Sequence, residues 1–487
     1  MEFIRKLPTL TLKKDAFPFQ KEAFNLIKNE EYFAIFHEQG LGKTKIAIDL
    51  LYYWLKTSAV DSVLIVTKKS LIKNWEEELT IHGNMHPLIL SSKKSVIYEK
   101  MSLPGYIYLC NYESLRGNKE IFKDFLQFRN FGIILDESTQ IKTPSSKLTK
   151  SLHYLAEHAK KRIIMTGTPL SNRPYDIWAQ IYFLDYGLRL GNSFDEFKER
   201  YDLSNDLSKD YSGRIIFENN LKILSDKLKD CSVRETKKTA GIQLPGRKFI
   251  AENIEMESKQ KILYQKFQDE LSAQVLKDGK QVTEDVEVIL KRLIRLVQVA
   301  SHPKLVDESY CETSPKLIAT EKIITKAISE NSKVIVWTNF VENVDTICNF
   351  FNKKGIVGIS GKIKPNKRDA LIERFRKDID TKILVATPGV AREGLTLVEA
   401  NYSIFYDRNF SLENYLQAQD RIYRISQSKD CFIYKLIHKD SIDEWVDALL
   451  DAKEVAARFG QGDIDEKEYQ ERINYDFSDI LQKILKS

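Results

Sequence analysis

A glycine-rich stretch near the start of the chain has the composition of a phosphate-binding loop, in residues 37–44 (HEQGLGKT). It follows a short apolar run and precedes a helical pattern, which is the context that such a loop requires. Gly40 and Gly42, with Leu41 between them, allow backbone N–H groups to turn inward around phosphate oxygens. The N-terminus of the following helix adds a partial positive charge, so we expect this loop to hold a nucleotide.

The side chains for nucleotide chemistry come directly after the second glycine of the loop. Lys43 is placed to reach the β- and γ-phosphates, and Thr44 to ligate Mg²⁺. His37 stands where such loops usually have their first glycine, and we interpret it as a structural replacement rather than a catalyst. A glycine turn that only caps a helix is the alternative for this stretch taken alone.

A second stretch places two adjacent acids after an apolar strand pattern, in residues 131–137 (FGIILDE). Two carboxylates at the end of a buried strand are costly unless a cation or water satisfies them. Asp136 would hold Mg²⁺ through water, and Glu137 would orient and deprotonate the attacking water. A solvated strand end is the alternative, but the upstream Gly-Lys-Thr favours the catalytic interpretation.

The elements that must position these residues are short apolar runs that alternate with helical patterns. The runs occupy residues 32–36, 63–66, 133–135, 163–165, 334–337, 383–386 and 404–406. Runs without polar alternation are typical of strands buried on both faces of a parallel sheet. The segment after the first run shows helical periodicity, because Ile46, Leu50, Leu51 and Trp54 share one face of a helix. This alternation predicts an α/β protein with doubly wound parallel sheets.

The apolar runs fall into two groups, and the sequence between them changes character. Segments 194–201, 221–228 and 289–299 are charged and amphipathic at helical spacing. We therefore expect four parts along the chain. They are an N-terminal ATP-binding lobe at 1–185, a mostly helical insertion at 186–310, a C-terminal lobe at 311–450 and a helical tail at 451–487.

Composition supports a multidomain globular protein and excludes several classes. The 487 residues are 43% hydrophobic and 30% charged, with a formal net charge of +6, which is too little to establish a nucleic-acid partner. Five cysteines without a CxxC pair indicate neither a zinc site nor a disulfide framework, so we expect the protein to work in the reducing interior of a cell. The charged N-terminus and the absence of an apolar run of about 18 residues predict neither a signal peptide nor a membrane span.

Three further strings resemble superfamily-two helicases. The most specific lies at 417–427 (QAQDRIYRISQ), where the spacing predicts that Arg421 and Arg424 share a helix face. The resemblance implies that these arginines reach the γ-phosphate across a cleft between two RecA-like lobes. It also implies that Gln20 of Pro-Phe-Gln reads the adenine edge, and that residues 166–172 (TGTPLSN) couple hydrolysis to motion.

Within that superfamily, other strings are similar to the Swi/Snf-type DNA translocases. Two of them resemble DNA-contact motifs, at 66–75 (VTKKSLIKNW) and 111–115 (NYESL). The helical-insert signature of the family is similar to 232–238 (SVRETKK) with 244–247 (LPGR). The segment that leads into the second lobe resembles 296–303 (LVQVASHP). Taken alone, Trp75 fits a core residue and His302 a turn residue before a proline.

Two departures from the family pattern affect the interpretation. Ser138 and Thr139 follow the acidic pair, and Asp-Glu-Ser resembles the annealing-helicase branch, which remodels forks. In residues 387–397 the family's double glycine is replaced by Ala-Arg, although Gly394, which the resemblance places at the nucleotide, persists.

The sequence therefore predicts a DNA-dependent ATPase that uses ATP and Mg²⁺ and moves on duplex or forked DNA without sequence preference. We expect a monomeric, cytoplasmic motor of prokaryotic or viral type, with a role in replication, repair or genome defence by analogy. The rivals are an RNA or single-strand helicase on the same scaffold and a hydrolysis-inactive DNA-binding module. A plain P-loop kinase would leave the second lobe unexplained.

Overall fold

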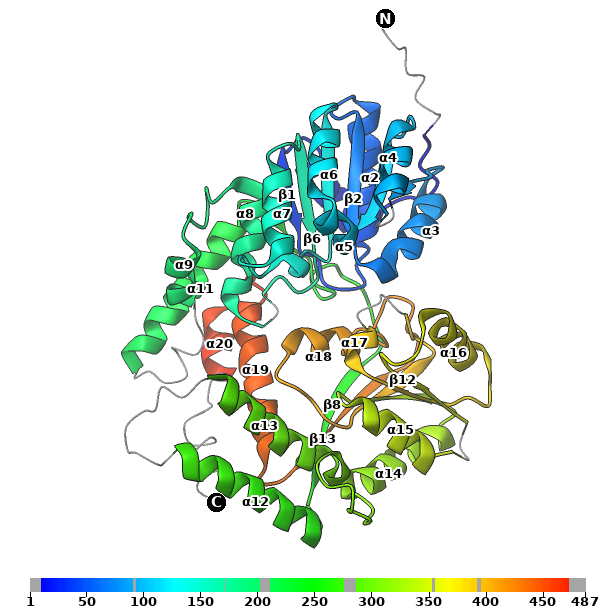
Figure 1. Cartoon of the computed structure of the whole chain (residues 1–487), viewed down its shortest axis with the longest axis vertical. Helices are drawn as coiled ribbons and strands as arrows, with labels where there is room; N and C mark the ends of the chain where they lie inside the picture. Colours follow the sequence, from blue (N-terminus) through cyan, green and yellow to red (C-terminus); the bar gives the residue numbers. More distant parts are fainter. Residues whose placement is uncertain are drawn as a thin grey trace, which may run out of the picture. The chain divides into compact units, whose positions relative to one another are not determined.

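The computed structural model describes residues 10–90, 93–170, 172–201, 211–275, 286–352, 355–391 and 396–472. The chain divides into two compact units (Figure 1). Unit 1 comprises Met1–Ile242 with Ala456–Tyr469, and unit 2 comprises Gln243–Val455 with Gln470–Ser487. A segment near the C-terminus therefore belongs to the unit that holds the N-terminus.

Unit 1 is built on a seven-stranded parallel sheet. Its strands, in spatial order, are β3 (Leu88–Leu90), β4 (Ile107–Asn111), β2 (Ser62–Thr67), β5 (Phe131–Asp136), β6 (Lys161–Met165), β1 (Tyr32–Ile35) and β7 (Ser232–Val233). Its helices are α1 (Pro18–Ile27), α2 (Lys43–Lys56), α3 (Ile72–His82), α4 (Lys94–Ser102), α5 (Tyr112–Gly117), α6 (Lys119–Gln127), α7 (Lys147–Ala156), α8 (Trp178–Asp185), α9 (Phe194–Tyr201) and α11 (Tyr211–Lys229). Short 3₁₀ turns lie at Lys69–Leu71, Ser138–Ile141 and Pro174–Ile177.

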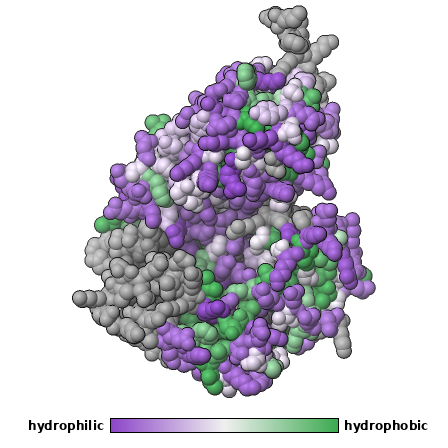
Figure 2. All heavy atoms as spheres, in the orientation of Figure 1, coloured by the Kyte–Doolittle hydropathy of each residue, from purple (hydrophilic) through white to green (hydrophobic). Residues whose placement is uncertain are grey.

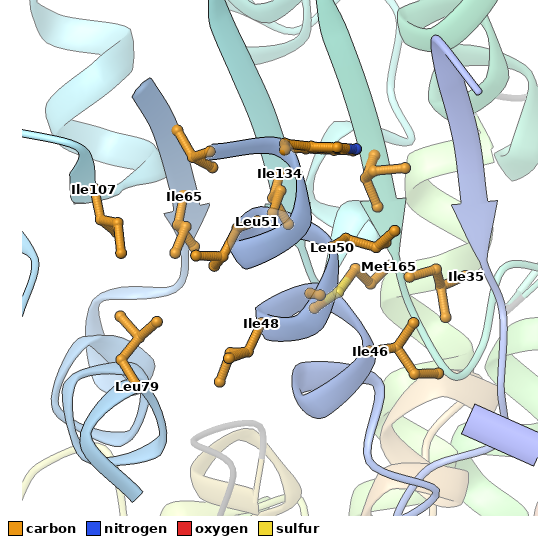
Figure 3. Packing of buried hydrophobic residues seen from close by; sticks show 14 of the residues in the cluster. Ile35, Ile46, Ile48, Leu50, Leu51, Ile65, Leu79, Ile107, Ile134 and Met165 are labelled. Carbon is orange, nitrogen blue, oxygen red and sulfur yellow. The ribbon is translucent and has the colours of Figure 1, made fainter. Parts of the chain in front are cut away.

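Helix α2 forms the centre of the hydrophobic core of unit 1. Its predicted apolar face is fully buried: Ile46, Leu50, Leu51 and Trp54 each have no exposed surface. Figure 3 shows the aliphatic side chains of α2 packed beside isoleucines of β1, β2 and β5, with Leu79 of α3 on the same core. This packing fixes the start of α2, and with it the phosphate loop, at the carboxyl edge of the sheet.

Unit 2 carries a six-stranded parallel sheet. Its strands, in spatial order, are β10 (Ile356–Ile359), β11 (Ile383–Ala386), β9 (Lys333–Trp337), β12 (Ala400–Phe405), β13 (Cys431–His438) and β8 (Arg247–Ile254). Its helices in the described ranges are α12 (Ser258–Val275), α13 (Val286–Ser301), α14 (Pro315–Ser329), α15 (Val341–Phe350), α16 (Pro365–Lys377), α17 (Pro388–Ala391), α18 (Leu412–Gln419) and the greater part of α19 (Ile442–Gly460), with a 3₁₀ turn at Pro303–Leu305. The end of α19 and most of α20 (Glu466–Arg472) belong to unit 1.

All seven predicted apolar runs are strands of these two sheets, so the doubly wound α/β expectation is confirmed. Six strands were not predicted, namely β3, β4, β7, β8, β10 and β13. Five of them are very short, interrupted by glycine or a polar residue, or exposed along one face, as in β8, and they lack the continuous apolar run that marks a central strand. Strand β4 differs, because Ile107–Cys110 is a continuous, buried apolar run that was missed.

The segment 186–310 contains the expected helices at 194–201, 221–228 and 289–299, as parts of α9, α11 and α13. It is not purely helical, because β7 and β8 also lie in it. Strand β7 pairs with β1 in unit 1, whereas β8 pairs with β13 in unit 2. The backbone of this segment is therefore shared between the two sheets.

The surface of unit 1 that Figure 2 displays is mostly hydrophilic, and hydrophobic residues appear there as separate spots. No helix within the described ranges combines the length and the apolar character needed to cross a bilayer.

Candidate nucleotide-binding site

The phosphate loop follows β1 and ends where α2 begins, as predicted. Gly40 has a φ of 86° and Gly42 a φ of 70°, both in the left-handed region that favours glycine. A Cβ on Gly42 would lie 2.4 Å from Nε2 of Gln20. Glycine is therefore required at Gly42 both by its backbone conformation and by the close approach of a neighbouring side chain.

Lys43 points back into the loop that it terminates. Its Nζ donates to the carbonyl oxygens of His37 at 2.9 Å and Glu38 at 3.4 Å. A Cβ on Gly167 would lie 3.2 Å from the same Nζ, so the segment that begins the Thr-Gly-Thr-Pro string packs directly on the loop. Thr44 follows half-buried in the first turn of α2. The structure thus brings together two of the predicted motifs.

Gln20 holds the loop to helix α1. Its Nε2 donates to the carbonyl oxygen of Leu41 at 3.0 Å, and its Oε1 accepts from the backbone N–H of Phe17 at 2.9 Å. Gln20 is buried. The amide therefore has a structural role at the loop, and its expected contact with adenine stays a prediction.

Asp136 ends β5 and is held by three donors of unit 1. One carboxylate oxygen, Oδ2, accepts from the indole N–H of Trp75 at 2.7 Å and from Oγ1 of Thr67 at 3.0 Å. The hydroxyl of Tyr112 donates to the Asp136 carbonyl at 2.7 Å. Burial and the neighbouring Glu137 raise the pKa of the Asp136 carboxyl. The hydrogen bonds from Trp75 and Thr67 and the charge of Lys43 lower that pKa, and the net shift is upward.

Glu137 adopts a left-handed backbone conformation, with a φ of 55°. This conformation is uncommon for a residue other than glycine and is often found at functional sites. The next residue, Ser138, donates to Oε1 of Gln180 at 2.7 Å, and Nε2 of Gln180 donates to the Pro169 carbonyl at 3.2 Å. The Asp-Glu-Ser segment and the Thr-Gly-Thr-Pro segment are therefore connected through one glutamine that the sequence did not indicate.

Several buried polar atoms in the loops after β1, β5 and β6 have no hydrogen-bond partner among the described residues. They are Nε2 of Gln39, Oε2 of Glu137 and Oγ1 of Thr168. Buried polar groups normally have partners, and these three strands are neighbours in one parallel sheet. Their loops therefore meet at one edge, and this donor and acceptor set fits phosphate, Mg²⁺ and water. Burial, with the nearby charge of Lys43, lowers the pKa of His37 to about 3, so this ring stays neutral.

The Ser-Val-Arg-Glu-Thr-Lys-Lys string, residues 232–238, also contacts the phosphate loop and the strand before it. The backbone N–H of Glu38 donates to the Glu235 carbonyl at 2.8 Å, and Nζ of Lys237 lies 3.1 Å from Oε1 of Glu38. Arg234 donates to the carbonyl of Phe36. The sequence singled out this string only as part of an insertion, whereas the structure places it against the phosphate loop.

Arg421 and Arg424 belong to unit 2 and do not lie on a helix. Helix α18 ends at Gln419, and residues 420–426 form turns, so the prediction of a shared helix face is wrong. Each arginine instead donates its Nε to the carbonyl four residues earlier, at 3.1 Å to Gln417 and 3.0 Å to Asp420. Arg424 also donates to Oγ1 of Thr396 at 2.6 Å.

Some expected residues lie outside the described residues, namely Ser171 and 392–395 with Gly394. His302 accepts from the backbone N–H of Lys304 at 3.2 Å, as a turn residue would. Trp75 is buried in the core of unit 1, as expected for a tryptophan, but its indole N–H also donates to Asp136.

Comparison with known proteins agrees with the family resemblance. The model of the SNF2-related domain matches residues 27–305, and the helicase conserved C-terminal domain matches residues 315–426. The first match covers more than half of the chain. The chain belongs to the SNF2-related family, and the resemblance to Swi/Snf-type proteins is confirmed.

Individual relatives are considerably longer than this chain. It is 29% identical to an uncharacterized ATP-dependent helicase of Mycoplasma pneumoniae over 84% of its own length and 38% of the relative's. It is 25% identical to a zebrafish (Danio rerio) DNA repair and recombination protein RAD54-like, over 84% and 60%, and 27% identical to the putative ATP-dependent helicase/translocase YwqA of Bacillus subtilis, over 90% and 48%. The chain thus spans less than two thirds of the curated relatives it matches. Among solved structures, the Sulfolobus solfataricus SWI2/SNF2 ATPase core in complex with double-stranded DNA is 25% identical and covers 99% of both chains, with a TM-score of 0.43.

Proposed function

We propose that this chain is an ATP-driven motor that moves on double-stranded DNA. The observation that carries the proposal is the edge of unit 1 where the phosphate loop, Asp136 and Glu137 meet, in a chain of the SNF2-related family. The names of the zebrafish and B. subtilis relatives, which refer to DNA repair and to translocation, support DNA as the track.

The residues of unit 1 divide the chemistry between them. Lys43 neutralises charge on the β- and γ-phosphates, and Gly40, Leu41 and Gly42 present backbone N–H groups to them. Thr44 and Asp136 would hold Mg²⁺, which when bound stabilises the charge that develops on the phosphates. Glu137 orients the attacking water and accepts its proton.

Arg421 and Arg424 of unit 2 would complete the reaction by stabilising the γ-phosphate. This part of the proposal rests on the resemblance of residues 417–427 to the superfamily-two motif. A guanidinium acting on a transferring phosphoryl group raises turnover by about 10³–10⁵-fold. Since the arginines and the phosphate loop belong to different units, turnover would require the units to close on the nucleotide, and DNA that favours closure would stimulate it.

The test is the nucleic-acid dependence of ATP turnover by the full chain. We expect stimulation by duplex DNA of any sequence and displacement of a triplex-forming third strand, with little unwinding of long blunt duplexes. Because phosphate binding releases counterions, stimulation falls with salt at a slope of roughly −0.9 per neutralised phosphate. The Asp-Glu-Ser variant of the acidic motif further predicts that forked DNA stimulates better than linear duplex.

The main rival is an RNA or single-strand helicase on the same scaffold. Strong stimulation by RNA with none by duplex DNA would establish that rival and overturn the translocase. Equal stimulation by forked and linear duplexes would remove only the preference for forks. A monomeric state and a cytoplasmic location stay predictions.

A further inference from the structure

Two donors from different elements converge on the same oxygen of Asp136. The indole N–H of Trp75, on α3, lies 2.7 Å from Oδ2, and Oγ1 of Thr67, at the end of β2, lies 3.0 Å from it. Both residues are almost wholly buried, with 1% of Trp75 and none of Thr67 exposed. These buried donors are outside the nucleotide machinery that the phosphate motifs define.

The arrangement leaves the two carboxylate oxygens with different roles. Oδ2 is occupied by Trp75 and Thr67, whereas no side chain in the described ranges donates to Oδ1 of Asp136. A carboxylate anchored through one oxygen has its side-chain rotamer fixed and its other oxygen directed away from the donors. Outer partners of this kind orient metal ligands and tune the affinity of the site.

The 3₁₀ turn before α3 and the first turn of α3 carry two exposed lysines, Lys69 and Lys73, which together form a basic edge, whereas the next turn carries the exposed acids Glu76 and Glu77. Lys69 and Asn74 are exposed, and 84% of the Lys73 side chain is accessible, where its ammonium lies 3.8 Å from Glu77. Trp75 follows within the same turn and points to the core. A single turn at the start of α3 therefore joins a solvent-facing basic edge to the acid that ends β5.

We propose that Trp75 and Thr67 are positioning residues that hold the Asp136 carboxylate for Mg²⁺-nucleotide binding, and that polyanion binding at Lys69 and Lys73 is transmitted to Asp136 through Trp75. This inference rests on the proposed function and adds a physical route from DNA to the metal site. The route needs no contact from unit 2, because every residue in it belongs to unit 1.

The test compares the affinity of the full chain for ADP in Mg²⁺ and in EDTA, by calorimetry, without turnover. Trp75→Phe keeps a buried ring and removes only the donor side of the indole, and Thr67→Val removes the hydroxyl at nearly constant volume. We expect each substitution to reduce the Mg²⁺-dependent gain in ADP affinity by about 10-fold or more, the usual loss when an outer partner of a metal ligand is removed. Affinity in EDTA stays unchanged, because the phosphate loop is intact.

Trp54→Phe is the matched control. Trp54 is equally buried in the same core, and its indole N–H donates to the Lys28 carbonyl at 3.2 Å, at a different place in unit 1. We expect this variant to keep the wild-type Mg²⁺ dependence. Equal losses in Trp54→Phe and Trp75→Phe, or a loss that is the same in Mg²⁺ and EDTA, would mean that Trp75 only supports the fold and would overturn the proposal.

A second measurement addresses the route from the basic edge. We expect a short DNA duplex to change the affinity of the wild-type chain for Mg²⁺-ADP, and we expect Trp75→Phe to lose that change while still binding the duplex. Thr67→Val, which leaves Trp75 in place, retains it. Retention of the full DNA effect in Trp75→Phe excludes the route. If wild-type turnover does not respond to duplex DNA, the proposed function fails, whereas the Mg²⁺–EDTA comparison still decides the positioning role.

Discussion

Arg234 and Asp463 are 229 positions apart in the chain and form a two-point ion pair in unit 1. Nε of Arg234 lies 2.7 Å from Oδ1 of Asp463, and a terminal guanidinium nitrogen lies 2.6 Å from Oδ2. The other terminal nitrogen donates to the carbonyl of Phe36, just before the phosphate loop. One guanidinium therefore connects Ala456–Tyr469 to the loop that is expected to bind nucleotide.

We predict that Asp463→Asn destabilises unit 1 and weakens nucleotide binding together. The ion pair is largely buried, with 16% of the Arg234 side chain and 7% of the Asp463 side chain exposed, so removing one charge leaves the other unpaired. We expect the free energy of unfolding to fall by about 3 kcal/mol, measured by urea denaturation. The control is Glu466→Gln, which breaks the exposed pair with Lys222 and should cost below about 1 kcal/mol. Similar effects from both substitutions would contradict the role of the buried pair.

Lys43→Ala and Glu137→Gln should both abolish ATP turnover, for different reasons. Without Lys43 the phosphates lose their side-chain cation, so ATP affinity should fall as well. Glu137→Gln leaves the phosphate and metal contacts in place, and it should retain ATP binding while losing the acceptor for the proton of water. The measurement is steady-state turnover beside equilibrium ATP binding. Wild-type turnover in Glu137→Gln would exclude Glu137 as the general base.

Substitution of the arginines in the full chain tests the role of unit 2. A chain cut near residue 310 would also lose Ala456–Tyr469, which belongs to unit 1. Arg421→Ala and Arg424→Ala should each keep ATP binding and lower DNA-stimulated turnover by about 10³-fold or more, as expected for a guanidinium acting on the transferring phosphoryl group. Arg374→Ala, which removes an exposed arginine of unit 2 that pairs with Asp378, is the control. Full DNA-stimulated turnover in both variants would show that these arginines of unit 2 take no part in hydrolysis.

His438 should make the stability of unit 2 depend on pH. Its Nδ1 lies 3.2 Å from the Ile254 carbonyl, and its Nε2 lies 3.3 Å from the amide nitrogen of Gln260, which fits a neutral ring with its proton on Nδ1. Burial, and then the charge of Lys316, lower the pKa of His438 to about 4, against the opposing effect of Asp443.

Lowering the pH should destabilise unit 2, because the unfolded chain binds a proton on His438 at a higher pH than the folded chain does. Between about pH 6.5 and 4 the unfolded chain binds the His438 proton and the folded chain does not, so stability is fully present above pH 6.5 and falls as the pH is lowered. The contribution of one such group is at most about 1.4 kcal/mol per pH unit. His438→Gln should make the pH dependence of urea unfolding shallower between pH 6.5 and 5. An unchanged slope would show that His438 does not contribute.

Local sequence was sufficient for the strand–loop–helix around Lys43 and for the strand that ends in Asp136. In both places the signal is complete within about a dozen residues, because a buried strand needs a continuous apolar run and a phosphate loop needs glycines before a helix. The face formed by Ile46, Leu50, Leu51 and Trp54 was predictable for the same reason, since helical periodicity is a property of neighbouring residues.

Only the tertiary structure decided which distant residues meet. Trp75 and Asp136 are 61 positions apart, and Arg234 and Asp463 are 229 apart, so no local period connects either pair. The end of α18 at Gln419, which moves Arg421 off the helix, also depends on surrounding packing rather than on spacing. Periodicity determines which face of an element is buried. The partner of a buried polar group on that face is set by whatever the fold packs against it, because such a group must be satisfied wherever it lies.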